Sequence, residues 1–269
     1  MHSLEVRVGS ARGFVTVVAY RALLDDVRAL LGEIDSHAGG VGRPTITWAV
    51  THRDTANALV LRIEPFEPTA ESDDRVLFAA GAVVGGVREL TTAPSIPAYY
   101  TQEAVEELGK AAGRRGTSGI DRLELAAVNG RVLDIAEVTE SVRVNAAASV
   151  APVTRSAGSV EGVVDALRGG AKGKRRATLY NTSTRRGVRV RLQEADVEDF
   201  RAAWGKRVAV RGMIDYNRLG QPISVDAEQL LILEVPAARE SLREMIGIGP
   251  DWTGGRALGD VMKDLRRRA

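Results

Sequence analysis

Residues 45–66, TITWAVTHRDTANALVLRIEPF, decide how the N-terminal half of the chain folds. Two runs rich in apolar and β-branched residues, 45–53 and 56–66, lie on either side of a short polar break. Such runs are typical of neighbouring strands joined by a turn. We therefore predict a β-hairpin with a tight turn at Asp54–Thr55.

The segments on either side of this hairpin show strand and helix patterns in turn. Residues 4–9, LEVRVG, alternate as a half-buried strand does, whereas residues 14–40 have the helical period. Residues 72–90 are also helical, with Ser72 as the expected N-cap. The apolar face expected for the first helix consists of Leu23, Leu24, Val27, Leu30, Leu31 and Ile34. Residues 4–90 therefore predict the order β-α-β-β-α.

A helix, a hairpin and a final short helix complete the N-terminal half. Thr101 is the expected cap of a helix over 101–113, and 137–150 reads as a short helix. Asn129–Gly130 is the signal of a type I′ turn in a hairpin over 120–135. We predict an α+β domain over residues 1–150, followed by a linker over 151–157 of turn-forming composition.

The pattern after this linker is that of a small all-β domain. About five short strands are expected from residues 159–168, 176–193 and 206–234, with one helix at 194–205. Short strands separated by turns are typical of a small closed barrel of the OB or SH3-like kind. We predict such a β-barrel over residues 158–236, so the fold class is α+β.

Composition excludes several kinds of protein. The chain has 269 residues, a formal net charge of +2 and no cysteine, which excludes disulfides and thiolate metal sites. The first residues, MHSLEVRVGSARG, contain no apolar core of a signal peptide, and no apolar run reaches the ~18 residues that cross a membrane. We expect a cytoplasmic protein that does not bind membranes.

No catalytic motif is present in the sequence. The three histidines, His2, His37 and His52, do not have the spacing of a metal site. The stretch RGGAKGKR, residues 168–175, departs from the phosphate-binding loop G-x-x-x-x-G-K-[ST], since Arg168 replaces the first Gly and Arg175 the Ser or Thr. We therefore predict no catalytic residues, no metal and no cofactor.

Residues 168–191 are rich in Arg and Lys and contain no Asp or Glu. Cations on the loops of a barrel, with an aromatic residue between them, are typical of a nucleic-acid-binding face. The residues predicted to bind DNA or RNA are Lys172, Lys174, Arg175, Arg176, Tyr180, Arg185, Arg186 and Arg189. The alternative is a solvated hairpin whose charges protect an edge strand from aggregation.

The last residues of the chain, 237–269, read as an amphipathic arm. Two short helical patterns flank GIGPDWTGG, residues 247–255, where Gly and Pro interrupt the helices and Trp252 is a large apolar anchor. Helices this short rarely persist alone in water, so the arm needs a surface on which to dock. That surface is the body of the same chain, a second copy of the chain or a different protein. The anchors expected on that surface are Leu242, Met245, Ile246, Trp252, Leu258, Val261, Met262 and Leu265.

The order of short helix, GIGPDWTGG, short helix and terminal arginines resembles the C-terminal neutralising segments of bacterial type II antitoxins that bind PIN-domain ribonucleases. The resemblance covers about the last 30 residues. It implies that the arm wraps a ribonuclease and that Arg266, Arg267 or Arg268 neutralises the acidic site of that enzyme. Those antitoxins are commonly short, with a small DNA-binding head, whereas this chain has a long body before the arm.

Two functions are therefore predicted, and they are compatible. The first is a non-enzymatic bacterial antitoxin-like or regulatory protein whose arm occludes a protein partner. The alternative is a nucleic-acid-binding protein that uses the basic barrel face. The sequence leaves the identity of the partner and the oligomeric state open.

Overall fold

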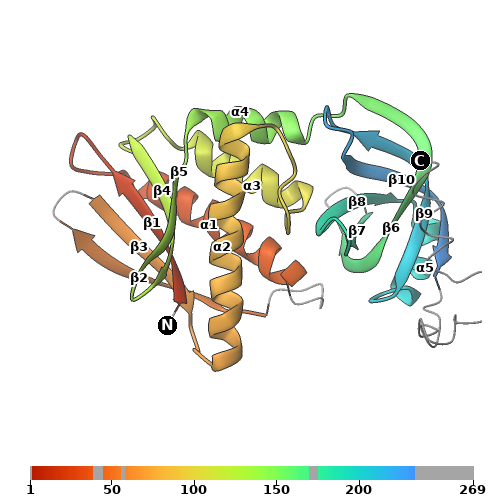
Figure 1. Ribbon diagram of the computed structural model, residues 1–269, viewed down its shortest axis with the longest axis horizontal. Coiled ribbons are helices and arrows are strands. Elements are labelled where there is room, and N and C mark those ends of the chain that lie inside the picture. The colour runs from red at the N-terminus through yellow and green to blue at the C-terminus, as the bar shows by residue number, and fades with distance from the viewer. Residues whose placement is uncertain (1, 39–44, 56–57, 170–174, 234–269) are drawn as a thin grey trace, which may run out of the picture. The chain divides into compact units, whose positions relative to one another are not determined.

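The computed structural model describes residues 2–38, 45–55, 58–169 and 175–233 of the protein (Figure 1). The chain divides into two compact units, Met1–Leu233 and Glu234–Ala269. The predicted arm, 237–269, lies outside the described residues. Both sheets and all of the helices discussed here belong to the first unit.

The N-terminal half contains a five-stranded antiparallel sheet of order β2-β3-β1-β4-β5. Its strands are β1 (His2–Gly9), β2 (Trp48–Thr55), β3 (Ala58–Pro65), β4 (Arg122–Asn129) and β5 (Arg131–Glu137). Strand β1 lies between β3 and β4, the arrangement of two split βαβ units. The predicted element order of this half is therefore confirmed.

One turn predicted for this sheet is misplaced, and another, in the confirmed β4–β5 hairpin, differs in type. Asp54 and Thr55 belong to β2, whose pairing with β3 continues to Thr55↔Ala58, because a β-branched Thr fits an extended strand. At the β4–β5 turn, Gly130 has a φ of +66°, but Asn129 is not among the described residues with positive φ. A type I′ turn needs positive φ at both central residues, so this turn is of another type.

Four helices lie on one side of this sheet (Figure 1). They are α1 (Val17–Ala38), α2 (Ala70–Thr92), α3 (Gln102–Gly113) and α4 (Glu140–Ser149). Alternate residues of β1, namely Leu4, Val6 and Val8, are buried in one core with the helices. The predicted apolar face of α1 is confirmed: its members are buried, except for Leu24, which is partly buried against the same core.

The start of α2 differs from the prediction. Its N-cap is Thr69, whose hydroxyl accepts from the Ser72 backbone N–H at 3.1 Å, while the Ser72 hydroxyl accepts from the Thr69 N–H at 2.7 Å. Ser72 is thus the third helical residue of a reciprocal capping box rather than the cap. The predicted cap of α3, Thr101, is confirmed, because its hydroxyl accepts from the Ala104 N–H at 3.0 Å.

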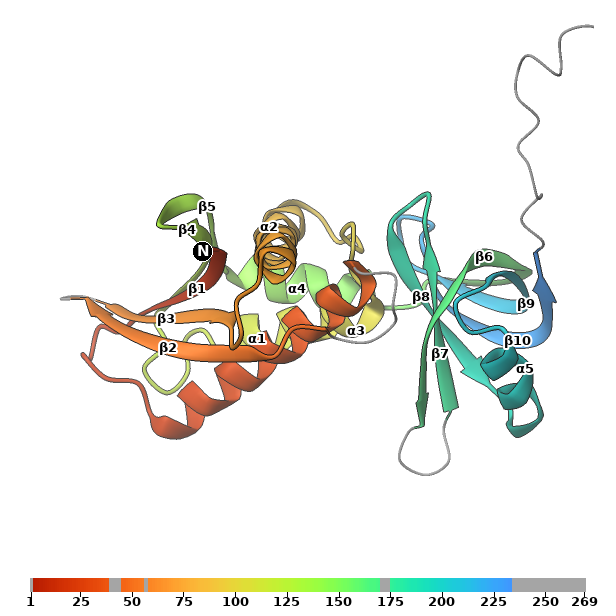
Figure 2. The same ribbon diagram turned by 90° about the horizontal axis from the view of Figure 1, so that it is seen from below.

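The C-terminal half contains a second sheet whose five strands pair in a closed ring, β10-β8-β7-β6-β9 (Figure 2). The strands are β6 (Thr154–Gly169), β7 (Arg175–Asn181), β8 (Arg186–Leu192), β9 (Arg207–Tyr216) and β10 (Pro222–Ile232). The short helices η2 (Glu194–Asp196) and α5 (Val197–Ala202) follow β8, and α5 inserts Phe200 into the core that the strands enclose. Helices and two sheets in one chain agree with the predicted α+β class.

The predicted linker 151–157 is largely strand. β6 starts at Thr154, and Thr154 to Ala157 pair with Tyr216 to Met213 of β9. The small polar residues that suggested a linker tolerate this pairing because it lies on the surface and the backbone supplies its hydrogen bonds. The first barrel strand, β6, therefore begins within a few residues of the end of α4.

Backbone and apolar contacts join the two halves within the first unit. The Gly187 N–H donates to the Tyr100 carbonyl at 3.0 Å, and the Ile96 N–H donates to Gln221 Oε1 at 2.9 Å. Ile223 of β10 is buried in the core of the N-terminal half. The loop before α3 is thus hydrogen-bonded to the start of β8.

Candidate binding surface of the barrel

The barrel strands place a row of arginines on their outer face. Arg168 of β6 lies opposite Arg176 of β7, which lies opposite Arg191 of β8. Val188 and Val190 point to the barrel core, so Arg189 and Arg191 point away from it. Like charges directly opposite each other on neighbouring strands are destabilising, so this row needs carboxylates nearby.

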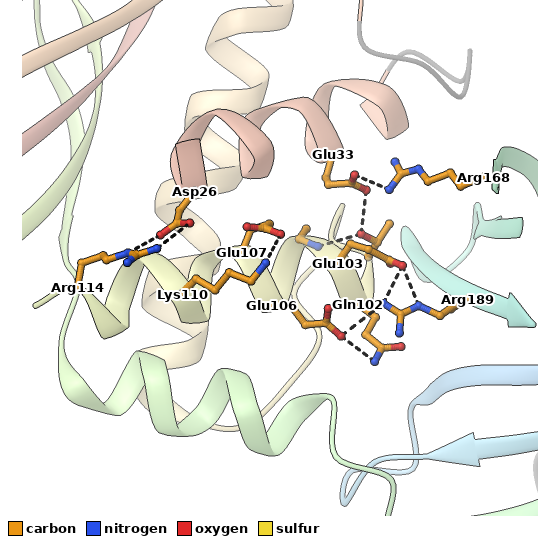
Figure 3. Close-up of polar contacts among 12 residues, drawn as sticks. Asp26, Glu33, Gln102, Glu103, Glu106, Glu107, Lys110, Arg114, Arg168 and Arg189 are labelled. Atoms are coloured by element: carbon orange, nitrogen blue, oxygen red, sulfur yellow. Dashed lines mark hydrogen bonds and ion pairs between the residues drawn. The ribbon is translucent and has the colours of Figure 1, made fainter. Parts of the chain in front are cut away.

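Helices α1 and α3 supply carboxylates to part of this row (Figure 3). Arg189 contacts one oxygen of Glu103 through both Nε and Nη2 at 2.7 Å, and Glu106 at 3.4 Å. Arg168 Nη1 lies 2.7 Å from Glu33, and Arg176 lies 3.7 Å from Glu103. These contacts connect the basic strands with the N-terminal half of the chain.

The ion pair between Arg189 and Glu103 is largely buried, which limits the contacts that this arginine can make with another molecule. The Arg189 side chain is 15% exposed and that of Glu103 is 18% exposed. Burial opposes the charge of Arg168, but its hydrogen bond to Glu33 and the nearby carboxylates more than offset this, so the pKa of Arg168 is raised. Arg189 is therefore a structural cation that contacts α3 and offers little surface to another molecule.

The remaining arginine of the row, Arg191, pairs with carboxylates of other barrel strands instead of with the helices. Arg191 hydrogen bonds to Asp226 and Asp215, which raises the pKa of Arg191. Arg191 in turn lowers the pKa of Asp226, and Arg155 adds to that effect. Two arginines and two aspartates therefore form a balanced cluster on β6, β8, β9 and β10.

The turn between β7 and β8 contacts the loop before α3. Arg185 Nη1 donates to the Tyr99 hydroxyl at 2.6 Å, and its guanidinium lies 5.5 Å from the centre of the Tyr99 ring. Arg186 Nε donates to the Ile96 carbonyl. Tyr180, near the same end of β7, is half-buried, and burial raises its pKa to about 12. This end of the predicted face thus contacts the protein's own N-terminal half.

An apolar groove adjoins Tyr99. It has a volume of ≈ 450 Å³ and is lined by α2 residues, among them Phe78, Gly81 and Gly85, and by the loop residues Pro97 and Tyr99. The Phe78 and Tyr99 rings meet edge-to-face, with centroids 4.5 Å apart. No sequence pattern indicates this groove, because α2 and the loop contribute apolar residues that also suit a core.

A second cavity lies at the other end of the β6–β7 pair. It has a volume of ≈ 460 Å³, and its charged lining residues are Arg168, Arg175, Arg176, Glu194, Glu198 and Arg201. Arg175 pairs with Glu194, and Arg201 pairs with Glu198 at 2.6 Å. Sequence reasoning selected Arg175 and Arg176 but missed Arg201, which α5 brings to the same cavity from a separate segment.

The predicted nucleic-acid-binding residues thus fall into separate groups. Arg175 and Arg176 line the cavity, Arg189 contacts α3, and Arg185 and Arg186 contact the loop before α3. Lys172 and Lys174 lie outside the described residues. All of the predicted partner-binding residues also lie outside them: Leu242, Met245, Ile246, Trp252, Leu258, Val261, Met262, Leu265, Arg266, Arg267 and Arg268.

The described residues contain neither a metal-binding cluster nor a membrane-spanning helix. In this part of the chain, no group of three or more His, Cys, Asp or Glu side chains is placed to hold a metal ion. None of the described helices is both long and apolar enough to cross a membrane.

Comparisons with known proteins give no relative. No protein-family model matches the chain, and no match is found among curated proteins or among solved structures. Function is therefore argued from the chain itself.

Proposed function

We propose that this chain is a non-enzymatic binding protein of the antitoxin-like or regulatory kind, whose arm, residues 237–269, occludes a protein partner. The observation that carries the proposal is the division of the chain at Glu234, where a compact body ends and the amphipathic segment begins. The body, Met1–Leu233, has two apolar cores of its own. We infer that the apolar residues of the arm pack on another molecule.

The sequence of the arm supports a ribonuclease of the PIN type as the partner. The apolar anchors from Leu242 to Leu265 would lie in a groove of the enzyme, with Trp252 as the largest. The arginines 266–268 would approach the carboxylates of a metal-dependent active site, where a guanidinium can bind a carboxylate through two hydrogen bonds. Inhibition would follow from occlusion and from neutralised charge, and this chain would need no catalytic residue.

Deletion of the arm tests the proposal. The full chain and a 1–236 variant are each used to isolate proteins from the native host, and the retained proteins are identified by mass spectrometry. We expect a metal-dependent ribonuclease with the full chain alone, and we expect the full chain, but not 1–236, to block RNA cleavage by that enzyme. An unchanged circular dichroism spectrum would show that 1–236 is folded. The proposal fails if both proteins retain the same partners.

A charge-matched control tests whether inhibition depends on the terminal arginines themselves or only on the net charge of the protein. Replacement of Arg266, Arg267 and Arg268 by Ala should weaken inhibition of the ribonuclease. Replacement of Arg12, Arg131 and Arg218, which are exposed on the body, removes the same charge and should leave inhibition unchanged. Equal loss in the two triple variants would indicate a nonspecific charge effect.

Nucleic-acid binding by the barrel is the second candidate function. The specific observation that favours it is the cavity lined by four arginines. The test is the affinity for a single-stranded oligonucleotide as a function of salt, since contacts with phosphates give a log affinity that falls linearly with log salt. Flat salt dependence, or no binding of any oligonucleotide, would remove this candidate.

A further inference from the structure

The cavity at the end of the β6–β7 pair has more positive than negative lining groups. Arg168 and Gly169 come from the end of β6, Arg175 and Arg176 from the start of β7, and Arg201 from α5. Glu194 and Glu198 are its acidic lining residues. Four arginines from three elements therefore line the cavity, a combination that a single charged strand cannot supply.

The two carboxylates of the lining are only loosely held. Their side chains are 79% exposed for Glu194 and 74% exposed for Glu198. Ion pairs between solvent-exposed side chains contribute little, because water and salt screen them. An anion that enters the cavity can therefore replace Glu194 at Arg175 and Glu198 at Arg201 at small cost.

The other two arginines are held in position by carboxylates outside the cavity. Arg168 is paired with Glu33 of α1 at 2.7 Å, and Arg176 lies 3.7 Å from Glu103 of α3. Each of these arginine side chains is about two-fifths exposed, at 39% and 41%. An arginine has five N–H donors, so one carboxylate does not saturate it, and the remaining donors stay available.

We propose that this cavity binds phosphate groups, as a polyphosphate or a phosphodiester chain presents them. The planar guanidinium matches the phosphate oxygens through two parallel hydrogen bonds, and four lining arginines from three elements offer donors for more than one phosphate. The volume of ≈ 460 Å³ lies within the range of ligand sites, and Leu167, Leu192 and Val197 form an apolar wall beside the charges. The inference rests on no property of the arm.

Two probes distinguish the source of the phosphates: tripolyphosphate, measured by calorimetry, and a labelled single-stranded oligothymidylate, measured by fluorescence anisotropy, both with the full chain. At low salt we expect binding of at least one probe. The double variant Arg175→Ala/Arg201→Ala should weaken that binding by at least tenfold and reduce the slope against log salt by one to two units. Glu194→Gln/Glu198→Gln should strengthen it several-fold, because the competing carboxylates are removed.

A control variant tests whether the loss of any two exposed arginines weakens binding. Arg131→Ala/Arg218→Ala removes two exposed arginines that do not line the cavity and should leave both affinities within about twofold. Binding of tripolyphosphate alone would support the phosphate site and refute nucleic-acid binding. No binding of either probe, or equal affinities in the two cavity variants, would overturn the inference. Because one cavity variant is expected to gain affinity, misfolding cannot imitate the complete result.

Discussion

Tyr99 and Arg185 hold each other in the left-handed region of backbone conformation. Their φ angles are +70° and +56°, which L-residues other than Asn and Asp seldom adopt. The Tyr99 N–H donates to the Arg185 carbonyl at 2.5 Å, while the Arg185 guanidinium donates to the Tyr99 hydroxyl. Two reciprocal bonds and a cation–π contact thus offset the backbone cost at both residues.

Substitution of Arg185 by Gly and by Ala should distinguish the free-energy cost of the left-handed backbone at this residue from the contribution of its side-chain contact with Tyr99. Arg185→Ala and Arg185→Gly both remove the bond to Tyr99, but Gly adopts the left-handed conformation without strain. We expect Arg185→Gly to be more stable than Arg185→Ala by about 1 kcal/mol in urea unfolding. Equal stabilities would show that φ at this position relaxes when the side chain is lost.

Two adjacent glycines of α2 should respond in opposite directions to the same substitution. A Cβ at Gly86 would overlap the Tyr100 ring and hydroxyl, and Tyr100 is fully buried, whereas a Cβ at Gly85 meets nothing within 4 Å. We expect Gly86→Ala to lower the free energy of unfolding by about 1–3 kcal/mol. Gly85→Ala should raise it by about 0.5–1 kcal/mol, because Ala is the better helix former. The same sign for both would contradict the packing of Tyr100 on α2.

The pairing of Arg189 with α3 predicts a difference between two glutamates of one helix. Glu103→Gln removes the carboxylate that contacts a mostly buried guanidinium, so we expect a loss of about 1–3 kcal/mol in chemical denaturation. Glu107 pairs with Lys110, which is 55% exposed, at 2.6 Å, so Glu107→Gln should cost about 0.5 kcal/mol or less. A larger loss at Glu107 would mean that α3 does not hold Arg189.

The buried carboxylate of Glu5 predicts a dependence of stability on pH. Burial acts to raise the Glu5 pKa, but hydrogen bonds from Arg62 and Arg7, both at 2.8 Å, outweigh it, and the net pKa lies below its ordinary value of 4.5. A lowered folded-state pKa gives a stabilisation that is present above pH 4.5 and is lost as the pH falls through the folded pKa.

Glu5→Gln measures this contribution directly. We expect the variant to be less stable than the natural protein at pH 7 by about 1–3 kcal/mol, and the gap to narrow towards pH 3. Urea unfolding of both proteins at several pH values gives the gap. A gap independent of pH would assign the loss to packing rather than to charge.

The sequence predicted the elements that have a strong local period. The helical period of α1 and the runs of β2 and β3 lie in contiguous residues, so each can be found without knowledge of distant partners. The start of a helix is harder to predict where two nearby residues can each act as the N-cap, as Thr69 and Ser72 can at the start of α2. The strand at 154–157 was missed because its partner, β9, is distant in sequence and because its own residues, Thr, Arg, Ser and Ala, show no apolar alternation.

The role of the barrel arginines could not be predicted, because their partners are also distant in sequence. Arg189 and Glu103 are 86 residues apart, and nothing in the local pattern relates the basic strands to α3. The stretch 168–191 reads as one charged segment, but β7 and β8 form a hairpin whose extended strands separate Arg175 and Arg176 from the turn at Arg185 and Arg186. Arg175 and Arg176 line a cavity, to which a separate segment, α5, supplies Arg201.

The last strand of the barrel also acts as a mechanical anchor. β10 is hydrogen-bonded on one side to β9, antiparallel along nearly its whole length, and on the other to β8, in parallel. Traction on the chain beyond Leu233, directed along the strand axis, would load these ladders in shear, so many hydrogen bonds would share the force rather than break one after another. The end of β10 would therefore resist a pull along this axis better than a strand that is hydrogen-bonded on one edge alone.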